Sequence, residues 1–257
     1  MTSHPAIAPA SAATFAPAPS GEPRFAIYYT TPADHPLTRA AEAWLGRSAF
    51  ERKSQPASSI AGSSRGQGNN RNTLVGEPRR YGFHATLKAP FRLADGVTVE
   101  ELERALSKFA NSTRPCPLGP LHVGMLGGFL ALVPVQPMLR VRSLCADVVE
   151  AFDSFRAPFN TAELKRRRIE CLDDGEAEHL VRWGYPYVFD RFRFHMTLTN
   201  RIQPEERSRV EAELELRLGH LLDEDFAIDA VTLFDQESPD ADFVVRRRFP
   251  LNPEALL

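Results

Sequence analysis

The sequence of 257 residues predicts an α+β fold of two duplicated halves related by a pseudo-two-fold axis. First, segments with the alternating pattern of strands are interleaved with segments of helical period. Second, the pattern F-H-x-T-L occurs twice, at residues 83–87 and 194–198. Third, the same order of helix and hairpin follows each copy, as expected for an internal duplication.

The bulk composition limits the classes of function. Apolar residues make up 43% of the chain, which suits a packed core. Lys and Arg total 31 against 33 for Asp and Glu, so the near-zero net charge argues against a chain coated by nucleic acid. No apolar run approaches the roughly 18 residues that suggest a membrane span. The scattered cysteines (Cys116, Cys145 and Cys171) predict buried thiols in a reducing cytoplasm.

Two segments carry few bulky apolar residues. Residues 1–23 are rich in Ala and Pro and predict a disordered tail, which leaves residues 24–257 as one bilobal domain. Residues 51–78 predict a flexible insertion, densest in Ser, Gly and Asn between 54 and 72. The insertion ends just before the first motif and is either a lid or a tolerated surface loop. The surface loop is favoured because long loops close at low entropic cost.

The first lobe is expected to span residues 24–137. Thr98 and Glu101 form the capping-box pattern that begins a helix, and Gly127-Gly128 marks a hairpin turn. The expected elements are a strand at 24–30, a helix at 35–50, a strand at 80–93, a helix at 98–112 and a hairpin at 118–135.

The second lobe, residues 138–257, is expected to repeat this order. Pro204 suits the first position of a helix. The expected elements are helices at 139–154 and 161–182, a strand at 190–203, a helix at 204–221, and a hairpin formed by 225–235 and 242–251. The hairpins end at similar distances from the two motif histidines, 52 residues (136 − 84) and 55 residues (250 − 195).

Each motif strand is expected to present a histidine and a threonine side by side. Because side chains alternate along a strand, His84 and Thr86 share one face, as do His195 and Thr197. Side chains two apart on one face are roughly 6.5–7 Å apart, so one phosphate can contact both. A lone H-x-T is a weak signal, whereas two copies in the same context predict a functional pair facing each other.

Two histidines beside one groove suit displacement at phosphorus. One imidazole takes a proton from the attacking oxygen and the other gives a proton to the leaving oxygen. Threonine hydroxyls can donate hydrogen bonds to the non-bridging phosphate oxygens. The residues leave open which histidine is the base. No metal or other cofactor is implied, because neither strand face offers a third ligand.

Other residues are weaker candidates for substrate binding. The repeat pairs Arg80 with Arg191, and each is either a phosphate ligand or a solvated charge at a strand entrance. Alternation places Lys88 and Arg193 on the histidine faces. Tyr28 is a candidate for stacking on a sugar or base, with a partly buried sheet tyrosine as the favoured alternative. The basic runs at 165–168 and 246–248 predict solvated faces or strand ends, with an RNA-backbone role as the alternative.

The paired motifs His84-Ala85-Thr86 and His195-Met196-Thr197 resemble those of the two-histidine phosphoesterase superfamily. The resemblance covers most of residues 24–251 and implies the duplicated two-lobed fold of that superfamily, with two antiparallel sheets, helices outside and a central cleft. It also implies that the histidines act as acid and base and the threonines as phosphate ligands. Residues 80–91, 155–167 and 183–199 resemble a branch of uncharacterised proteins encoded with carbon–phosphorus lyase genes for phosphonate use.

The resemblance implies a metal-independent cyclic phosphodiesterase that opens a small phosphoribosyl cyclic phosphate, such as 5-phosphoribosyl 1,2-cyclic phosphate. Such an enzyme acts on a small-molecule partner in the cytoplasm, with a bell-shaped pH–rate profile and activity that survives EDTA. Two alternatives remain: a 2′,3′-cyclic phosphodiesterase on RNA ends or nucleotides, disfavoured by the near-neutral charge, and a non-catalytic protein that binds a phosphorylated ligand.

Overall fold

The computed structural model describes residues 21–52, 68–136, 139–167 and 171–255. Most of the expected N-terminal tail and residues 53–67 of the expected insertion therefore lie outside the described residues. A helix spans residues 68–81 and so includes the last part of the expected insertion, residues 68–78.

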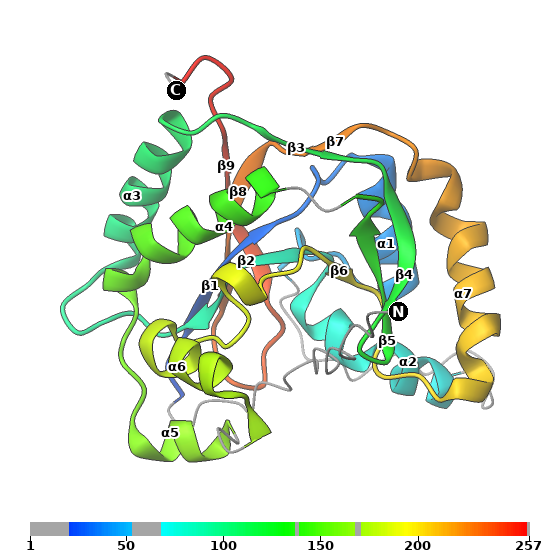
Figure 1. Ribbon diagram of the computed structural model, residues 1–257, viewed down its shortest axis with the longest axis horizontal. Helices are drawn as coiled ribbons and strands as arrows, with labels where there is room; N and C mark the ends of the chain where they lie inside the picture. Colours follow the sequence, from blue (N-terminus) through cyan, green and yellow to red (C-terminus); the bar gives the residue numbers. More distant parts are fainter. Residues whose placement is uncertain (1–20, 53–67, 137–138, 168–170, 256–257) are drawn as a thin grey trace, which may run out of the picture.

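The chain alternates between helices and strands, which Figure 1 labels. The elements up to the middle of the chain are β1 (Arg24–Tyr29), α1 (Pro36–Leu45), α2 (Gly68–Tyr81), β2 (Ala85–Phe91), α3 (Val99–Asn111), β3 (Cys116–Gly119), β4 (Leu121–Leu126) and β5 (Phe129–Pro134). The remaining elements are α4 (Leu139–Ala151), α5 (Thr161–Arg166), α6 (Asp174–Trp183), β6 (Met196–Thr197), α7 (Pro204–Leu218), β7 (Phe226–Ile228), β8 (Ala230–Gln236) and β9 (Val244–Pro250).

The strands form one large antiparallel sheet and one small one. The large sheet has seven strands in the order β4-β5-β6-β2-β1-β8-β9, and β3 pairs with β7 in the second sheet. This differs from the expected pair of sheets, one in each lobe. The two-residue strand β6 makes the connection, because Met196 lies opposite Ala85 of β2 on one side and opposite Leu132 of β5 on the other.

The order of elements after each motif recurs, but the hairpins cross over. The series β2-α3-β3-β4-β5 is followed later by β6-α7-β7-β8-β9. Hairpin β4-β5 follows the first motif yet pairs with β6 of the second, whereas β8-β9 follows the second motif and joins β2 through β1. Likewise α3 packs against β8 and β9, and α7 packs against β4. The repeat boundaries at 24–137 and 138–257 stay a prediction.

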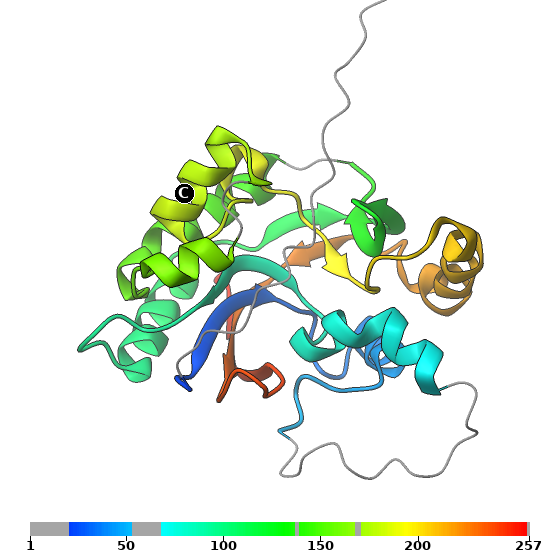
Figure 2. The same ribbon diagram turned by 90° about the horizontal axis from the view of Figure 1, so that it is seen from below.

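Two groups of helices flank the strands. Helices α3, α4, α5 and α6 lie on one side and α1, α2 and α7 on the other, with the strands passing between them (Figures 1 and 2). One large apolar cluster contains Ile27, Leu87, Met196 and Val148, from β1, β2, β6 and α4. Burial of such side chains stabilises the fold by about 1.5–3 kcal/mol each. In the described part of the chain, no helix combines the length and apolar character that crossing a membrane requires.

Several local predictions are confirmed. The Thr98 hydroxyl accepts from the Glu101 backbone N–H, and the Glu101 carboxylate accepts from the Thr98 N–H, which completes the capping box at α3. The hairpin turn has φ of 56° at Gly127 and 102° at Gly128, values that glycine adopts without steric cost. Pro204 is the first residue of α7.

Other element boundaries were wrong. The expected helix at 161–182 is two helices, because Asp173 begins α6 with a capping box of its own. The expected strand at 80–93 begins only at Ala85, since residues through Tyr81 complete α2. The expected strand at 190–203 contains only the two residues of β6. Cys171 is exposed, so the expectation of buried thiols holds only for Cys116 and Cys145.

Candidate active site

The two H-x-T motifs lie next to each other in the large sheet. Ala85 of β2 is the antiparallel partner of Met196 of β6. Continuing this register by one residue on each side places His84 opposite Thr197, and Thr86 opposite His195. Each histidine thus has the threonine of the other motif as its cross-strand neighbour. The residues between them in sequence are buried in the core, whereas all four motif side chains are half-buried.

Both histidines are held by the same backbone contact. His84 Nδ1 lies 2.8 Å from the Gly82 carbonyl oxygen, and His195 Nδ1 lies 2.8 Å from the Arg193 carbonyl oxygen. A carbonyl only accepts, so Nδ1 carries the proton and donates in each ring. Nε2 of the neutral ring is therefore the acceptor. The Thr86 hydroxyl, 3.3 Å from His84 Nε2, donates to that nitrogen.

Burial lowers the basicity of both rings. The pKa of His84 falls from 6.5 to about 4, chiefly through burial and further through the positive charge of His195, while the Gly82 carbonyl opposes the shift. The pKa of His195 is also lowered, first by burial and then by the charge of Arg193. Both imidazoles are consequently neutral at pH 7 in the free protein.

Tyr28 supports His84 and is not open to a ligand. Its ring stacks on the His84 ring with centroids 3.8 Å apart and planes at 23°. Tyr28 is 1% exposed, because β1 lies inside the sheet and Phe234 and Phe243 cover the ring. The expectation that Tyr28 stacks on a sugar or base was therefore wrong, and the alternative of a buried sheet tyrosine is confirmed.

Lys88 does not share the face of the histidines. The register of β1 and β2 shifts between the pairs Tyr28–Thr86 and Ile27–Lys88, which inserts an extra residue in β2. This bulge moves Lys88 to the face of Ile27, since paired residues point to the same side. Its Nζ donates to the Val149 carbonyl of α4 at 3.1 Å and pairs with Asp153 at 3.0 Å. The alternation that placed Lys88 at the site was wrong.

The remaining predicted arginines have different surroundings. Arg191 lies in a 3-10 turn at Phe189–Arg191, where it pairs with Asp173 and Asp190 at 3.1 and 3.4 Å. Arg193 is exposed and, among the described residues, its side chain has no ion pair or hydrogen bond. Arg80 is in α2, not on a strand, and its Nε and Nη2 atoms are buried without a hydrogen-bond partner. The repeat pairing of Arg80 with Arg191 thus does not describe equivalent positions.

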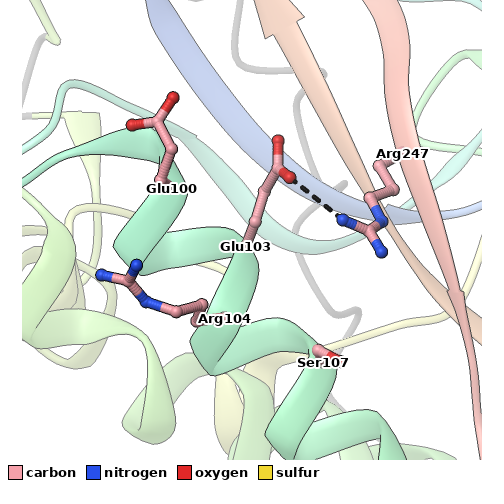
Figure 3. Close-up of a pocket in the computed structure, with 5 residues that line it drawn as sticks. All are labelled: Glu100, Glu103, Arg104, Ser107 and Arg247. Carbon is pink, nitrogen blue, oxygen red and sulfur yellow. Dashed lines mark hydrogen bonds and ion pairs between the residues drawn. The ribbon is translucent and has the colours of Figure 1, made fainter.

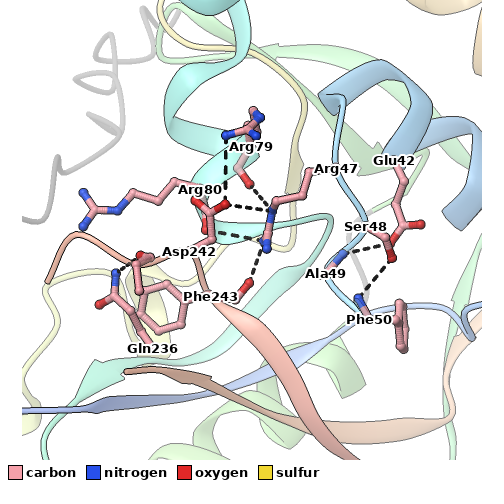
Figure 4. Close-up of polar contacts among 11 residues, drawn as sticks. Glu42, Arg47, Ser48, Ala49, Phe50, Arg79, Arg80, Gln236, Asp242 and Phe243 are labelled. Atoms are coloured by element: carbon pink, nitrogen blue, oxygen red, sulfur yellow. Dashed lines mark hydrogen bonds and ion pairs between the residues drawn. The ribbon is translucent and has the colours of Figure 1, made fainter. Parts of the chain in front are cut away.

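An arginine network holds the end of α2 beside His84. Arg47 Nε donates to the Arg79 carbonyl at 2.9 Å, and Arg47 Nη2 donates to the Phe243 carbonyl at 2.5 Å (Figure 4). Asp242 pairs with Arg47 at 3.7 Å and with Arg79 at 4.0 Å. The network fixes the chain where α2 ends and Gly82 turns towards His84.

Replacing Gly82 by alanine is expected to impair both folding and the site. Gly82 has a φ of 78°, and an added Cβ would lie 2.6 Å from the Ala49 Cβ. Gly96 has the same φ but no atom within 4 Å of an added Cβ, so Gly96→Ala is the matched control. The left-handed backbone costs roughly 1–2 kcal/mol in both variants. Urea unfolding should show the larger loss in Gly82→Ala, and equal losses would contradict the steric argument.

Sequence reasoning missed Tyr81, whose ring centroid lies 6.3 Å from that of His84, and Arg24, which acts on Tyr81 and Tyr28. Arg24 and Tyr81 interact electrostatically, and Tyr81 also does so with Arg80. The available signal was a charged residue at the start of the apolar strand RFAIYY, which suggests a buried cation.

A surface pocket on α3 is separate from the motifs. Figure 3 shows its lining residues, Glu100, Glu103, Arg104, Ser107 and Arg247. Glu103 pairs with Arg246 at 2.6 Å and with Arg247 at 3.3 Å, and Arg248 pairs with Asp229 at 2.6 Å. The three arginines of the basic run at 246–248 therefore each pair with a carboxylate. The run lies in β9, as the expected strand at 242–251 predicted. Within the described ranges, no group of three or more His, Cys, Asp or Glu is placed to hold a metal ion.

The fold and the site define an α+β protein with a large antiparallel sheet that brings two His-Thr motifs together. Residues 86–244 match the model of the family described as "Protein of unknown function (DUF1045)", and the chain belongs to this family. The match includes Thr86 and the whole second motif, and it begins two residues after His84.

Relatives and structural neighbours add context. The chain is 34% identical over 238 residues to a Janthinobacterium protein (strain Marseille) named ribose 1,5-bisphosphate phosphokinase PhnN, covering 89% of this chain and 51% of the relative. A protein of that name from Laribacter hongkongensis (strain HLHK9) is 35% identical over 181 residues, 70% of this chain and 40% of the relative. The chain thus spans about half the length of these relatives, or less. A solved structure of a phosphoesterase is 15% identical with a TM-score of 0.35, covering 89% of this chain and 98% of the other.

Proposed function

We propose that this protein is a metal-independent cyclic phosphodiesterase that opens a small phosphoribosyl cyclic phosphate, such as 5-phosphoribosyl 1,2-cyclic phosphate, in phosphonate breakdown. The observation that carries the proposal is the matched pair of Nδ1 contacts on neighbouring motif segments. These contacts leave Nε2 of both rings available for proton transfer. Neutral imidazole is a base and protonated imidazole an acid, so two such rings supply both functions.

In the proposed reaction, water attacks phosphorus and one P–O bond of the cyclic diester breaks. His84 is assigned as the base because its pKa of about 4 keeps it deprotonated, and its Nε2 takes the proton of the attacking water. Protonated His195 gives its Nε2 proton to the leaving sugar oxygen. The product is a phosphomonoester with a free hydroxyl, and proton exchange with solvent restores both rings.

The threonines hold the reacting phosphate in this proposal. In the free protein the Thr86 hydroxyl donates to His84 Nε2, and on substrate binding it turns to a non-bridging phosphate oxygen. Thr197 is expected to do the same from the neighbouring strand. Arg193 supplies positive charge beside His195, and its exposed side chain is available for the substrate.

A phosphoribosyl substrate is supported by the resemblance to proteins of phosphonate use and by the relatives named for ribose 1,5-bisphosphate. Their kinase activity is not carried over to this chain. The sequence has no G-x-x-x-x-G-K-[ST] motif, the phosphate-binding loop of many kinases.

A panel of cyclic phosphates tests the proposal. The purified protein is incubated with ribosyl 1,2-cyclic phosphates and with 2′,3′-cyclic nucleotides, with and without EDTA, and products are followed by ³¹P NMR. We expect a higher kcat/KM for the ribosyl 1,2-cyclic phosphates and no loss in EDTA. A preference for 2′,3′-cyclic nucleotides would reassign the substrate, and tight binding without turnover would indicate a binding protein.

The pH dependence of kcat/KM is expected to be bell-shaped with its maximum below pH 6.5. The acid limb reports the base of the free enzyme, which is His84 near pH 4. The alkaline limb reports loss of the acidic proton of His195, whose pKa is lowered from 6.5. Anionic substrate favours the protonated rings, so the profile of kcat should lie at higher pH than that of kcat/KM. Rates that stay flat from pH 4 to 9 would contradict two titrating groups.

A further inference from the structure

Two buried arginine side chains have hydrogen-bond donors without a partner. Arg24, the first residue of β1, is 4% exposed, and its Nη2 is buried with no hydrogen-bond partner. Nε and Nη2 of Arg80 are likewise buried without a partner. Buried charged groups are normally paired, because leaving a donor unsatisfied costs about 1–3 kcal/mol or more. The free donors therefore point to an absent acceptor.

The surrounding polar groups hold these arginines without neutralising them. Arg24 Nε donates to Gln236 Oε1 at 2.7 Å, and Gln236 Nε2 donates to the Ala241 carbonyl at 2.7 Å, which fixes the amide orientation. Asp242 pairs with Arg47 and Arg79, and the Arg80 guanidinium extends away from that network in Figure 4. Among the described residues, no carboxylate lies within ion-pair distance of Arg24 or Arg80.

The two guanidinium groups belong to one cluster. The pKa of Arg24 is lowered, mainly by burial and further by the positive charge of Arg80. The Tyr81 hydroxyl lies close enough to the Arg24 side chain to interact with it as a hydrogen-bonding group, although Arg24 Nη2 itself has no partner, and Tyr81 interacts electrostatically with Arg80. Arg167, whose pKa burial lowers to about 10, adds a third positive charge that acts on the same group of side chains. The buried guanidinium groups repel each other because they carry like charges, and a bound anion would offset that repulsion.

The cluster is linked to His84 by two aromatic rings. Tyr81 lies 6.3 Å from the His84 ring, centroid to centroid, and Tyr28 stacks on His84 while interacting electrostatically with Arg24. The rings of Tyr28 and Tyr81 therefore connect the arginine cluster to His84.

We propose that Arg24 and Arg80 form a second anion subsite that binds the non-reacting phosphate monoester of the substrate. This inference rests on the proposed function and specifies its substrate class as a cyclic phosphodiester with a second, terminal phosphate. Guanidinium donors match the geometry of phosphate oxygens and form charge-assisted hydrogen bonds with them. A substrate without the terminal phosphate leaves these donors unpaired and is disfavoured.

Binding of ribose 5-phosphate, compared with ribose and inorganic phosphate, tests the subsite by calorimetry on the full chain. Ribose 5-phosphate should bind more tightly than ribose, and Arg80→Gln should weaken its binding by about 10–100-fold. Arg80→Lys should restore part of the affinity. Arg79→Gln, one residue earlier in α2 and paired with Asp242, is the matched control and should bind as the unmodified protein does. Equal binding by Arg80→Gln and Arg79→Gln overturns the proposal.

Arg24→Gln should weaken binding similarly, and circular dichroism checks its folding because Arg24 is buried. If it does not fold, Arg80→Gln decides the question alone. His84→Ala should still bind ribose 5-phosphate, which separates the subsite from the chemistry.

A kinetic comparison separates this inference from the proposed function. The unmodified protein should prefer ribosyl 1,2-cyclic phosphate that carries a 5-phosphate over the same compound without it, mainly through KM. Arg80→Gln should reduce that preference by at least about tenfold. Turnover of both compounds without preference overturns the subsite and leaves the proposed function standing. If neither compound is turned over, the proposed function fails and the binding measurements still decide the subsite.

Discussion

His84→Ala and His195→Ala are each expected to lower kcat for a cyclic phosphate by about 10²–10⁴-fold. Each substitution removes one of the two proton transfers, while the other histidine and both threonines remain. The double variant should lose much less than the product of the two single losses, because residues that act as a unit are not additive. Steady-state rates with a ribosyl cyclic phosphate measure all three.

The matched control is His220→Ala, which alters an exposed histidine in the 3-10 turn after α7. It should keep the rate of the unmodified protein. Near-normal turnover by either His84→Ala or His195→Ala would exclude the two-histidine mechanism. Thermal unfolding of each variant shows that a lost rate does not come from a lost fold.

The assignment of base and acid can be tested with the leaving group. A 4-nitrophenyl phosphodiester has a leaving group that departs without protonation, so loss of the general acid matters less. His195→Ala should therefore lose less activity with this substrate than with a ribosyl cyclic phosphate, whereas His84→Ala should lose similar factors with both. The reverse pattern would exchange the two roles.

Asp153→Ala is expected to destabilise the protein by about 1–3 kcal/mol, the cost of leaving the buried Lys88 donor without its partner. Lys88 is 3% exposed, and its Nζ lies 3.0 Å from Asp153 Oδ1. Burial already lowers the pKa of Lys88 to about 8, although Asp153 opposes that shift. Without Asp153 the ammonium would be buried with only the Val149 carbonyl as a partner. Urea unfolding at pH 7 measures the loss.

Lys88→Met is the companion variant and should be close to neutral in stability. It fills a similar volume with apolar atoms, and Asp153 keeps its contacts with Arg156 at 2.9 and 3.2 Å. The loss in Asp153→Ala should shrink at pH 9, where Lys88 is deprotonated and no charge is left unpaired. A large drop in kcat for Lys88→Met would indicate that Lys88 acts in the active site. It would contradict the assignment of Lys88 to a structural contact with α4.

Short stretches of sequence determine several local features of this protein. The Thr98 capping box, the Gly127-Gly128 turn and Pro204 at the start of α7 each depend on a few neighbouring residues. The alternation of His84 and Thr86 with buried apolar residues is likewise set by strand geometry over a few positions. The two copies of H-x-T are therefore visible without any knowledge of the fold.

The surroundings of those motifs depend on residues that are distant in sequence. Arg24 contacts Gln236, 212 positions away, and Lys88 contacts Asp153, 65 positions away. A single extra residue in β2 moved Lys88 from the expected face to the opposite one. Periodicity cannot register such a bulge, because it is produced by the pairing of two strands.

The sequence alone determined which groups the two motifs supply, a pair of imidazoles and a pair of hydroxyls, because side-chain identity fixes what can donate, accept or titrate. Only the tertiary structure decided that β6 and β2 are neighbours and that backbone carbonyls orient both histidine rings. It also decided that Arg24 and Arg80 have buried hydrogen-bond donors without a partner. Those outcomes follow from which strands pair and which groups become buried, and both are properties of the whole packed chain.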